Sequence, residues 1–154
     1  MRINKNPKNG NCALRDVFPG IRHITGLKRI LGKHYSDIIE NTRVVLEDKN
    51  VGYMRISKKI EVLISPTYLK TAKPEQLYLD LIHELVHVRQ SKEGKKIFDL
   101  PEPYIERATE IEAYRAAISE GKRKRLPRKF LLDHANVFWL SKEEQEKLAR
   151  KIGL

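Results

Sequence analysis

Residues 74–92 read PEQLYLDLIHELVHVRQSK, and this stretch decides how the rest of the chain can be arranged. Its apolar residues recur every three or four positions, which is the period of one face of an α-helix: Leu77, Leu81, Leu85 and Val88. Pro74 suits the first turn of a helix, and Gly94 suits its end. The pattern predicts a long helix with one side packed in the core.

The same stretch contains the pentapeptide HELVH, an HExxH motif formed by His83, Glu84 and His87. Histidines at positions i and i+4 share one helix face, so both imidazoles can reach one metal ion. Glu84 lies about 100° around the helix from His83, where its carboxylate can reach a metal-bound water without binding the metal. The motif predicts one zinc ion held by His83 and His87, with Glu84 as the general base.

A catalytic zinc of this kind takes a third protein ligand and keeps its fourth position for water. No histidine follows the motif before His134, so a carboxylate is expected. The next predicted helix, residues 104–120, carries four glutamates: Glu106, Glu110, Glu112 and Glu120. Helical geometry places Glu110 toward the apolar side of that helix. We therefore expect Glu110 as the third ligand, with Glu112 as the alternative and Glu106 after it.

The segments before the motif predict a small sheet. Three runs are rich in branched and aromatic residues, and short turn-like links separate them: residues 43–47, 52–57 and 60–65. Their spacing predicts an antiparallel meander. A helix is expected over residues 27–41, with Gly32 as its weak point. The expected fold class is therefore α+β, with a small antiparallel or mixed sheet packed on the HELVH helix and a helical C-terminal half.

A chain of 154 residues is the size of one domain, so residues 1–154 are expected to share one core. Ser141 opens the sequence SKEE, which is the pattern of a helix capping box, so a last helix should begin there. The expected parts are an irregular arm, a catalytic core, a basic loop and C-terminal helices, over residues 1–26, 43–120, 121–129 and 130–154.

Strands, an HELVH helix, a loop and a second helix carrying EIEAY follow one another over residues 43–120, and this order resembles the gluzincin branch of the zincin metallopeptidases. The resemblance implies a zinc-dependent, cytoplasmic peptidase in which Glu110 binds the metal and a small residue, here Ala113, follows three positions later. Tyr114 stands where the family commonly has Asp or Asn. The resemblance further implies that residues 60–65 form the upper rim of the cleft and pair with an extended peptide substrate.

The charge balance points to a second class of function. Thirty-one Lys and Arg residues stand against 20 Asp and Glu, which gives a net charge of +11. Six of the positive charges fall within eight residues: Lys122, Arg123, Lys124, Arg125, Arg128 and Lys129. Such a run could neutralise several phosphates. The alternative interpretation is thus a basic nucleic-acid-binding protein in which zinc is structural or vestigial.

The N-terminal sequence is polar, and the longest apolar runs are a few residues, so neither a secretory signal nor a membrane span is expected. A cytoplasmic location follows from this expectation. The single cysteine, Cys12, cannot form an internal disulfide. Its thiolate could instead bind the open position of the zinc and hold the enzyme latent.

Two further questions stay open in the sequence. Candidate donors to a developing oxyanion are Tyr104, Tyr114, Arg115 and His134. Hydrolysis of a non-peptide amide is a third possibility, because peptide deformylases also use an HExxH helix. Their third ligand is a cysteine within a dedicated motif, which the surroundings of Cys12 do not resemble.

Overall fold

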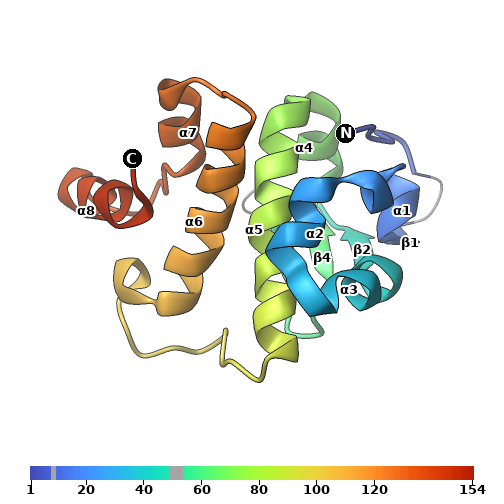
Figure 1. The fold of residues 1–154 in the computed structure, drawn as a ribbon, viewed down its shortest axis with the longest axis horizontal. Coiled ribbons are helices and arrows are strands. Elements are labelled where there is room, and N and C mark those ends of the chain that lie inside the picture. Colours follow the sequence, from blue (N-terminus) through green and yellow to red (C-terminus); the bar gives the residue numbers. More distant parts are fainter. Residues whose placement is uncertain (8–9, 49–53) are drawn as a thin grey trace.

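The computed structural model describes residues 1–7, 10–48 and 54–154, and it has an α+β architecture with one small sheet in its N-terminal half and a helical C-terminal half (Figure 1). The four strands are β1 (Asn11–Ala13), β2 (Arg43–Leu46), β3 (Met54–Ile56) and β4 (Val62–Ile64). They lie in the order β1-β2-β4-β3. The prediction of an α+β fold with a small mixed sheet is confirmed.

The predicted antiparallel meander is wrong, because β4 lies between β2 and β3. Strands β2 and β4 are parallel, with Val44 opposite Val62, whereas β3 and β4 are antiparallel. Val62 and Ile64 are buried, while the side chains of β3 are partly exposed, so burial favours β4 in the interior of the sheet and β3 at its edge. Residues 52 and 53 of the expected strand 52–57 lie outside the described residues.

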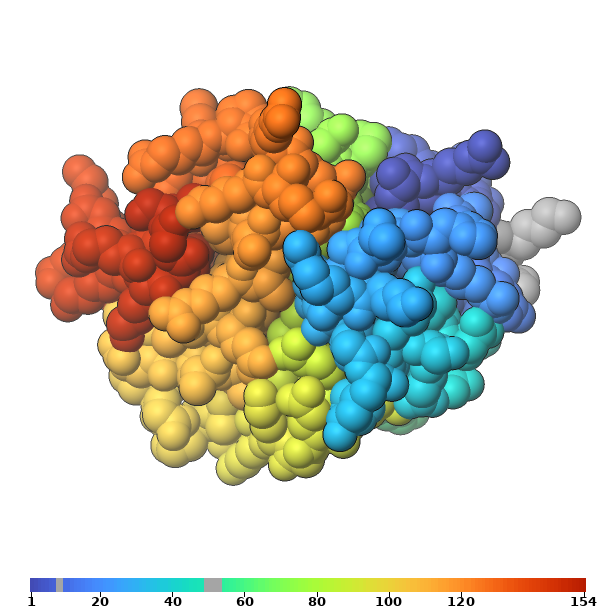
Figure 2. Space-filling view, viewed as in Figure 1, coloured from blue at the N-terminus to red at the C-terminus, as the bar shows by residue number. Residues whose placement is uncertain are grey.

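The helices pack around a long central helix. Their bounds are α1 (Leu14–Val17), α2 (Thr25–Leu31), α3 (Tyr35–Asn41), α4 (Pro66–Thr71), α5 (Pro74–Lys92), α6 (Ala108–Arg123), α7 (Arg128–His134) and α8 (Lys142–Ile152). Helix α5 has α6 on one side and α2 on the other (Figure 1), and it also packs against β3. Figure 2 shows the same division, with the N-terminal segments and the C-terminal segments on either side of α5. The helix predicted from the HELVH stretch therefore forms the centre of the molecule.

The N-terminal arm is not irregular as expected, because it contributes β1, α1 and part of the core. The side chains of Leu14, Val17 and Phe18 are fully buried. These three residues and Ile21 have the spacing of one helix face, although Pro19 and Gly20 interrupt the helix itself. The helix expected over residues 27–41 is split at Gly32, whose φ of 55° is unsuited to an α-helix.

The C-terminal boundaries also differ from the expectation. Helix α6 extends to Arg123 and α7 begins at Arg128, so half of the basic run is helical and residues 124–127 form the loop between the two helices. The helix expected around residues 130–140 ends at His134. The capping box of α8 is confirmed, since Ser141 Oγ accepts a hydrogen bond from the Glu144 N–H at 3.2 Å and Glu144 accepts one from the Ser141 N–H at 2.8 Å.

A buried carboxylate of α6 connects helices α2, α5 and α6. The side chain of Glu120 is fully buried, and it accepts hydrogen bonds from Tyr78 of α5 at 2.9 Å and Arg29 of α2 at 3.1 Å. Arg123 donates two more, at 2.7 and 2.6 Å. These partners outweigh the effect of burial and hold the pKa of Glu120 below its usual value. A charge that is buried with several partners of this kind is costly to disturb.

Gly26 tests this packing. A Cβ atom at Gly26 would lie 2.4 Å from Glu120 Oε1, so Gly26→Ala must push the carboxylate off its partners. Alanine would improve helix propensity by about 1 kcal/mol, yet we expect the free energy of unfolding to fall by roughly 1–2 kcal/mol. The measurement is a urea unfolding curve. Gly10→Ala is the matched control, because its Cβ meets nothing within 4 Å. A Gly26→Ala variant that is as stable as the control would contradict this account.

Candidate metal centre

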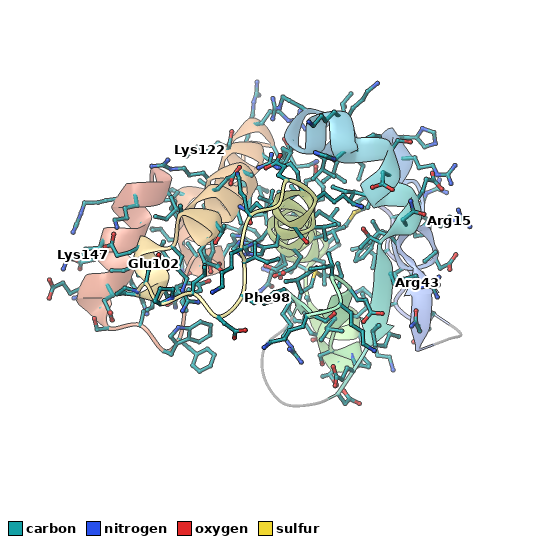
Figure 3. All side chains as sticks on the ribbon, turned by 90° about the horizontal axis from the view of Figure 1, so that it is seen from below. Arg15, Arg43, Phe98, Glu102, Lys122 and Lys147 are labelled. Carbon is teal, nitrogen blue, oxygen red and sulfur yellow. The ribbon has the colours of Figure 1, made fainter. Side chains whose placement is uncertain are left out.

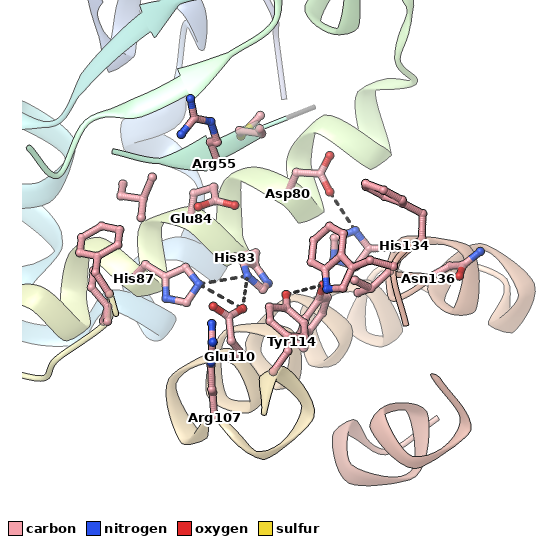
Figure 4. A pocket seen from close by; sticks show the side chains of 18 of the residues that line it. Arg55, Asp80, His83, Glu84, His87, Arg107, Glu110, Tyr114, His134 and Asn136 are labelled. Atoms are coloured by element: carbon pink, nitrogen blue, oxygen red, sulfur yellow. Dashed lines mark hydrogen bonds and ion pairs between the residues drawn. The ribbon is translucent and has the colours of Figure 1, made fainter. Parts of the chain in front are cut away.

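The contact between α5 and α6 brings His83, His87 and Glu110 together at the floor of a cleft (Figure 4). The Nε2 atoms of the two histidines lie 3.1 Å apart. Glu110 Oε2 lies 3.3 Å from Nε2 of His83 and 3.6 Å from Nε2 of His87. These are the three residues that the sequence analysis expects as ligands, and the structure places one ligand atom of each on a small triangle.

The triangle has the size that a tetrahedral metal ion requires. Ligand atoms about 2.0–2.1 Å from a tetrahedral zinc stand roughly 3.3–3.4 Å apart, and the three observed separations of 3.1, 3.3 and 3.6 Å bracket this value. A proton between the two nitrogens would satisfy one pair of atoms, whereas a cation inside the triangle satisfies all three. The group could therefore hold a metal ion.

A glutamine fixes the orientation and tautomer of His87. Gln90 is fully buried, and its Nε2 donates to the Thr109 carbonyl at 2.9 Å and to Glu112 Oε2 at 2.8 Å. Its Oε1 therefore faces His87 Nδ1, at 2.8 Å, and accepts the Nδ1–H. This hydrogen bond leaves the Nε2 lone pair of His87 available to a metal. Nδ1 of His83 has no hydrogen-bond partner among the described residues, and its ring packs edge-on against Tyr114 at 4.4 Å.

The two alternative carboxylates are engaged elsewhere. Glu112 pairs with Arg89 and with Lys95 in addition to its bond with Gln90, so it supports His87 from a distance and does not join the triangle. Glu106 pairs with Lys151 of α8. Of these three glutamates, Glu110 is the one that faces the histidines.

Glu84 lies on the side of α5 that faces the sheet. Its carboxylate accepts a hydrogen bond from the Ile56 N–H of β3. Burial, together with the nearby Glu110 and Asp80 carboxylates, raises the pKa of Glu84 to about 8, although His87 and the Ile56 N–H oppose this shift. Burial also disfavours the charge on Glu110, but the two histidines outweigh it and hold its pKa well below the usual value. The structure thus separates Glu110, whose pKa is lowered, from Glu84, whose pKa is raised toward neutral pH.

The cleft above the triangle has a volume of about 680 Å³, and Figure 4 shows several of the side chains that line it. One wall is β3, and the segment before α6 and the loop after α7 contribute to the other. The rim strand expected by family analogy, residues 60–65, is instead an interior strand, and the edge strand on the cleft is β3. The expected rim position is wrong because β4, and not β3, lies in the interior of the sheet.

A second histidine–carboxylate pair lines the same cleft and was not expected from the sequence. His134 Nδ1 lies 3.0 Å from Asp80 Oδ1, and Asp80 also accepts a hydrogen bond from the Tyr68 hydroxyl. His134 Nε2 is buried without a hydrogen-bond partner among the residues that the structure describes. Asp80 lies one helical turn before His83, so helical periodicity could have identified it as a residue near the site. The position of His134 in the sequence carries no such signal.

Of the other residues that the sequence suggested for the site, some line the cleft and others do not. Tyr104 and Tyr114 line the cleft with their hydroxyl oxygens 3.1 Å apart, and burial raises the pKa of both, so both stay protonated. Arg115 does not line the cleft, and its Nε donates to the Lys151 carbonyl. The proposed latency through Cys12 is wrong, because Cys12 is buried in β1, at the opposite edge of the sheet from β3.

Much of the basic run is engaged within the chain. Arg123 binds Glu120, Lys122 donates to the Gly153 carbonyl, and Lys129 pairs with Asp133. Lys124 lies over the ring of Tyr78 at 5.0 Å. Figure 3 shows Lys122 and Lys147 on the C-terminal half and Arg15 and Arg43 on the opposite side, so basic side chains also lie outside the basic run.

Comparisons with known proteins give no relative for this chain: no family model, no curated protein and no solved structure matches it. In the described part of the chain, none of the helices combines the length and the apolar character that crossing a membrane requires. The geometry of the site is therefore the basis for any functional assignment.

The identity of the third ligand can be tested by metal content. We expect one zinc per chain in the wild-type protein after incubation with zinc, and a loss of affinity greater than about 100-fold in Glu110→Gln. Glu112→Gln is the matched control, because it keeps an acceptor for Gln90 and should cost less than about tenfold. The measurement is elemental mass spectrometry of protein dialysed against a zinc buffer. Equal loss in both variants would contradict the assignment of Glu110.

Gln90 offers a separate test of ligand positioning. Gln90→Leu keeps much of the side-chain volume but removes the acceptor for His87 Nδ1, so we expect zinc affinity to fall about 10–100-fold. Unfolding temperatures with zinc and with a chelator distinguish this role from a packing role. A positioning role shrinks the difference between the two temperatures, whereas a packing role lowers both equally. Gln76→Leu, two turns before His83 on the same helix, is the control.

Proposed function

We propose that this protein hydrolyses peptide bonds with one bound zinc ion, held by His83, His87 and Glu110, and that Glu84 is its general base. The observation that carries the proposal is the placement of a buried carboxyl group beside a metal-sized triangle of ligand atoms in an open cleft. Two imidazoles and one carboxylate form a ligand set that suits zinc and leaves a fourth position open. The proposal includes membership of the gluzincin branch of the zincins.

The bound zinc would lower the pKa of water in the site and polarise the substrate carbonyl. Glu84 takes a proton from the attacking water as its oxygen adds to the carbonyl carbon. The same carboxyl group then gives that proton to the amide nitrogen as the C–N bond breaks, which releases an acid and an amine. The pKa of Glu84, raised by burial, suits a group that must accept and return a proton.

Edge strand β3 supports binding of an extended peptide. Its far side has no strand partner among the described residues, and it forms a wall of the cleft. The Ile56 N–H is occupied by Glu84, and the backbone of Met54, two residues earlier, faces the same side. An added strand could therefore pair with Met54 and with the Ile56 carbonyl, which would align a substrate backbone beside Glu84.

Donors to the developing oxyanion are available on the opposite wall. Tyr104 and Tyr114 keep their protons, and His134 Nε2 is a buried group without a partner in the described structure. Asp80 Oδ1 lies 3.0 Å from His134 Nδ1 and orients the ring, so that Nε2 is the nitrogen left for a substrate. These three residues are the proposed oxyanion donors, and Arg115 is not among them.

The nucleic-acid interpretation stays a prediction. Intramolecular contacts account for most of the basic run, and its side chains lie away from the cleft residues. Salt-sensitive binding of RNA or DNA that is lost when residues 122–129 are neutralised, in a protein with no peptidase activity, would favour that alternative.

Glu84→Gln tests the proposed mechanism. The substitution preserves size and leaves all three ligands intact, so zinc content should remain at one per chain. Peptide hydrolysis should fall by at least about 100-fold, because glutamine cannot accept the proton. Activity is measured on a mixture of proteome-derived peptides, with products identified by mass spectrometry. Hydrolysis that persists at the wild-type rate in zinc-loaded Glu84→Gln would exclude Glu84 as the general base.

A further inference from the structure

Two aromatic side chains stand exposed at the rim of the cleft. Phe138 is 72% exposed and Trp139 is 59% exposed, and among the described residues the other exposed large apolar side chain is Met1, at 37%. Both Phe138 and Trp139 line the same cleft as the His83, His87 and Glu110 triangle. Large apolar groups that stay exposed beside a candidate catalytic centre are typical of a binding surface.

The loop that carries these side chains is held in place. Val137 is buried, and its carbonyl accepts hydrogen bonds from the Leu140 N–H at 3.0 Å and from Gln145 Nε2 at 3.2 Å. Gln145 Nε2 also donates to the Leu140 carbonyl at 3.2 Å. The backbone on both sides of the aromatic pair is thereby tied to α8, which holds this loop beside the cleft.

A continuous series of aromatic contacts connects the rim to the triangle. The ring of His83 lies 4.4 Å from that of Tyr114, and Tyr114 lies 6.5 Å from Tyr104. Tyr104 lies 5.6 Å from Trp139, which lies 4.8 Å from Phe138. All four contacts are edge-to-face. An apolar side chain of a bound peptide that packs on this wall would therefore lie within a few residues of the peptide bond to be cleaved.

We propose that Phe138 and Trp139 form a substrate subsite for a large apolar side chain, aromatic or long aliphatic, of a peptide bound beside β3. This inference rests on the proposed function and specifies its substrate class. Side chains alternate along an extended peptide. If β3 pairs with the peptide backbone, a side chain that points across the cleft can reach the aromatic wall opposite.

The charges of the cleft favour a peptide over a nucleic acid. Four carboxyl groups line it, at Asp80, Glu84, Asp99 and Glu110, against two arginines, Arg55 and Arg107. A site that stacks the bases of a single strand needs a positively charged groove for the backbone phosphates. The exposed aromatic pair lies in a cleft that lacks this excess of positive charge.

The first arm of the test uses the intrinsic fluorescence of Trp139, which is the only tryptophan in the chain. N-acetylphenylalanine amide and N-acetylalanine amide are titrated into zinc-loaded Glu84→Gln protein, which does not consume them. We expect a saturable change in Trp139 emission with the phenylalanine probe, at a concentration at least about tenfold lower than with the alanine probe. Emission that responds equally to both probes, or to neither, would overturn the subsite.

The second arm measures cleavage specificity. Peptides cleaved by the wild-type protein are resynthesised as pairs that carry Phe or Ala at each position near the scissile bond. At one position kcat/KM should favour Phe by about tenfold or more, and the combined Phe138→Ala and Trp139→Ala substitutions should bring the ratio close to one. Trp139→Phe should keep the preference, and Lys142→Ala, at the start of α8, is the surface control. A ratio that is unchanged in the double variant would overturn the proposal.

A different binding partner of Phe138 and Trp139 would give a different result in each of these measurements. A wild-type dimer that the double variant converts to a monomer, measured by light scattering, would assign the pair to a contact between copies and overturn the subsite. Tighter binding of an oligothymidylate than of the phenylalanine probe would also overturn it. A positive fluorescence result without any peptide cleavage would support the subsite and reject the proposed function. Cleavage without side-chain preference would support the proposed function and reject the subsite.

Discussion

Polar side chains buried between two helices are costly unless each of them finds a partner, and the contact between α5 and α6 is organised by this requirement. Tyr78, near the start of α5, binds Glu120 near the end of α6. Gln90, near the end of α5, binds the carbonyl of Thr109 near the start of α6. The two helices are therefore antiparallel, and hydrogen bonds fix their relative position at both ends. The histidines of α5 meet Glu110 between these two anchors, so the geometry of the triangle depends on them.

Helix α5 also separates two chemical roles. Its face toward α6 carries His83 and His87, and the adjacent face toward β3 carries Glu84, because neighbouring residues on a helix point about 100° apart. The Ile56 N–H of β3 holds Glu84, while α6 supplies Glu110. The proposed base and the two histidines proposed as ligands are adjacent in sequence, yet different parts of the fold hold them. The cleft is the space between these parts, and the edge of the sheet lies along it.

The sequence predicts the local parts of this arrangement better than the long-range ones. The HELVH helix, the capping box at Ser141 and the apolar face of α6 each follow from spacing within one segment, and the structure contains all three. The order of β3 and β4 in the sheet and the approach of His134 to Asp80 depend on contacts between distant segments. Turn-like links and helical periodicity carry no information about such contacts. The prediction of an irregular N-terminal arm is wrong for a related reason, because Pro19 and Gly20 obscure a buried apolar face that begins at Leu14.

Glu110 differs from the other glutamates of α6 and of the turn before it in the side chains that it pairs with. Glu106 pairs with Lys151, Glu112 pairs with Arg89 and Lys95, and Glu120 pairs with Arg29 and Arg123. In the part of the chain that the structure describes, the ion pairs of Glu110 are made with histidines and not with lysine or arginine. A protein with a net charge of +11 has many cations that could have neutralised a buried carboxylate. Glu110 and Glu84 outweigh burial and raise the pKa of His87 to about 9, so without a metal the counter-charge of Glu110 is a proton on one imidazole. A divalent ion inside the triangle would replace that proton and bind all three ligand atoms at once, and this is the physical reason to propose a metal at Glu110.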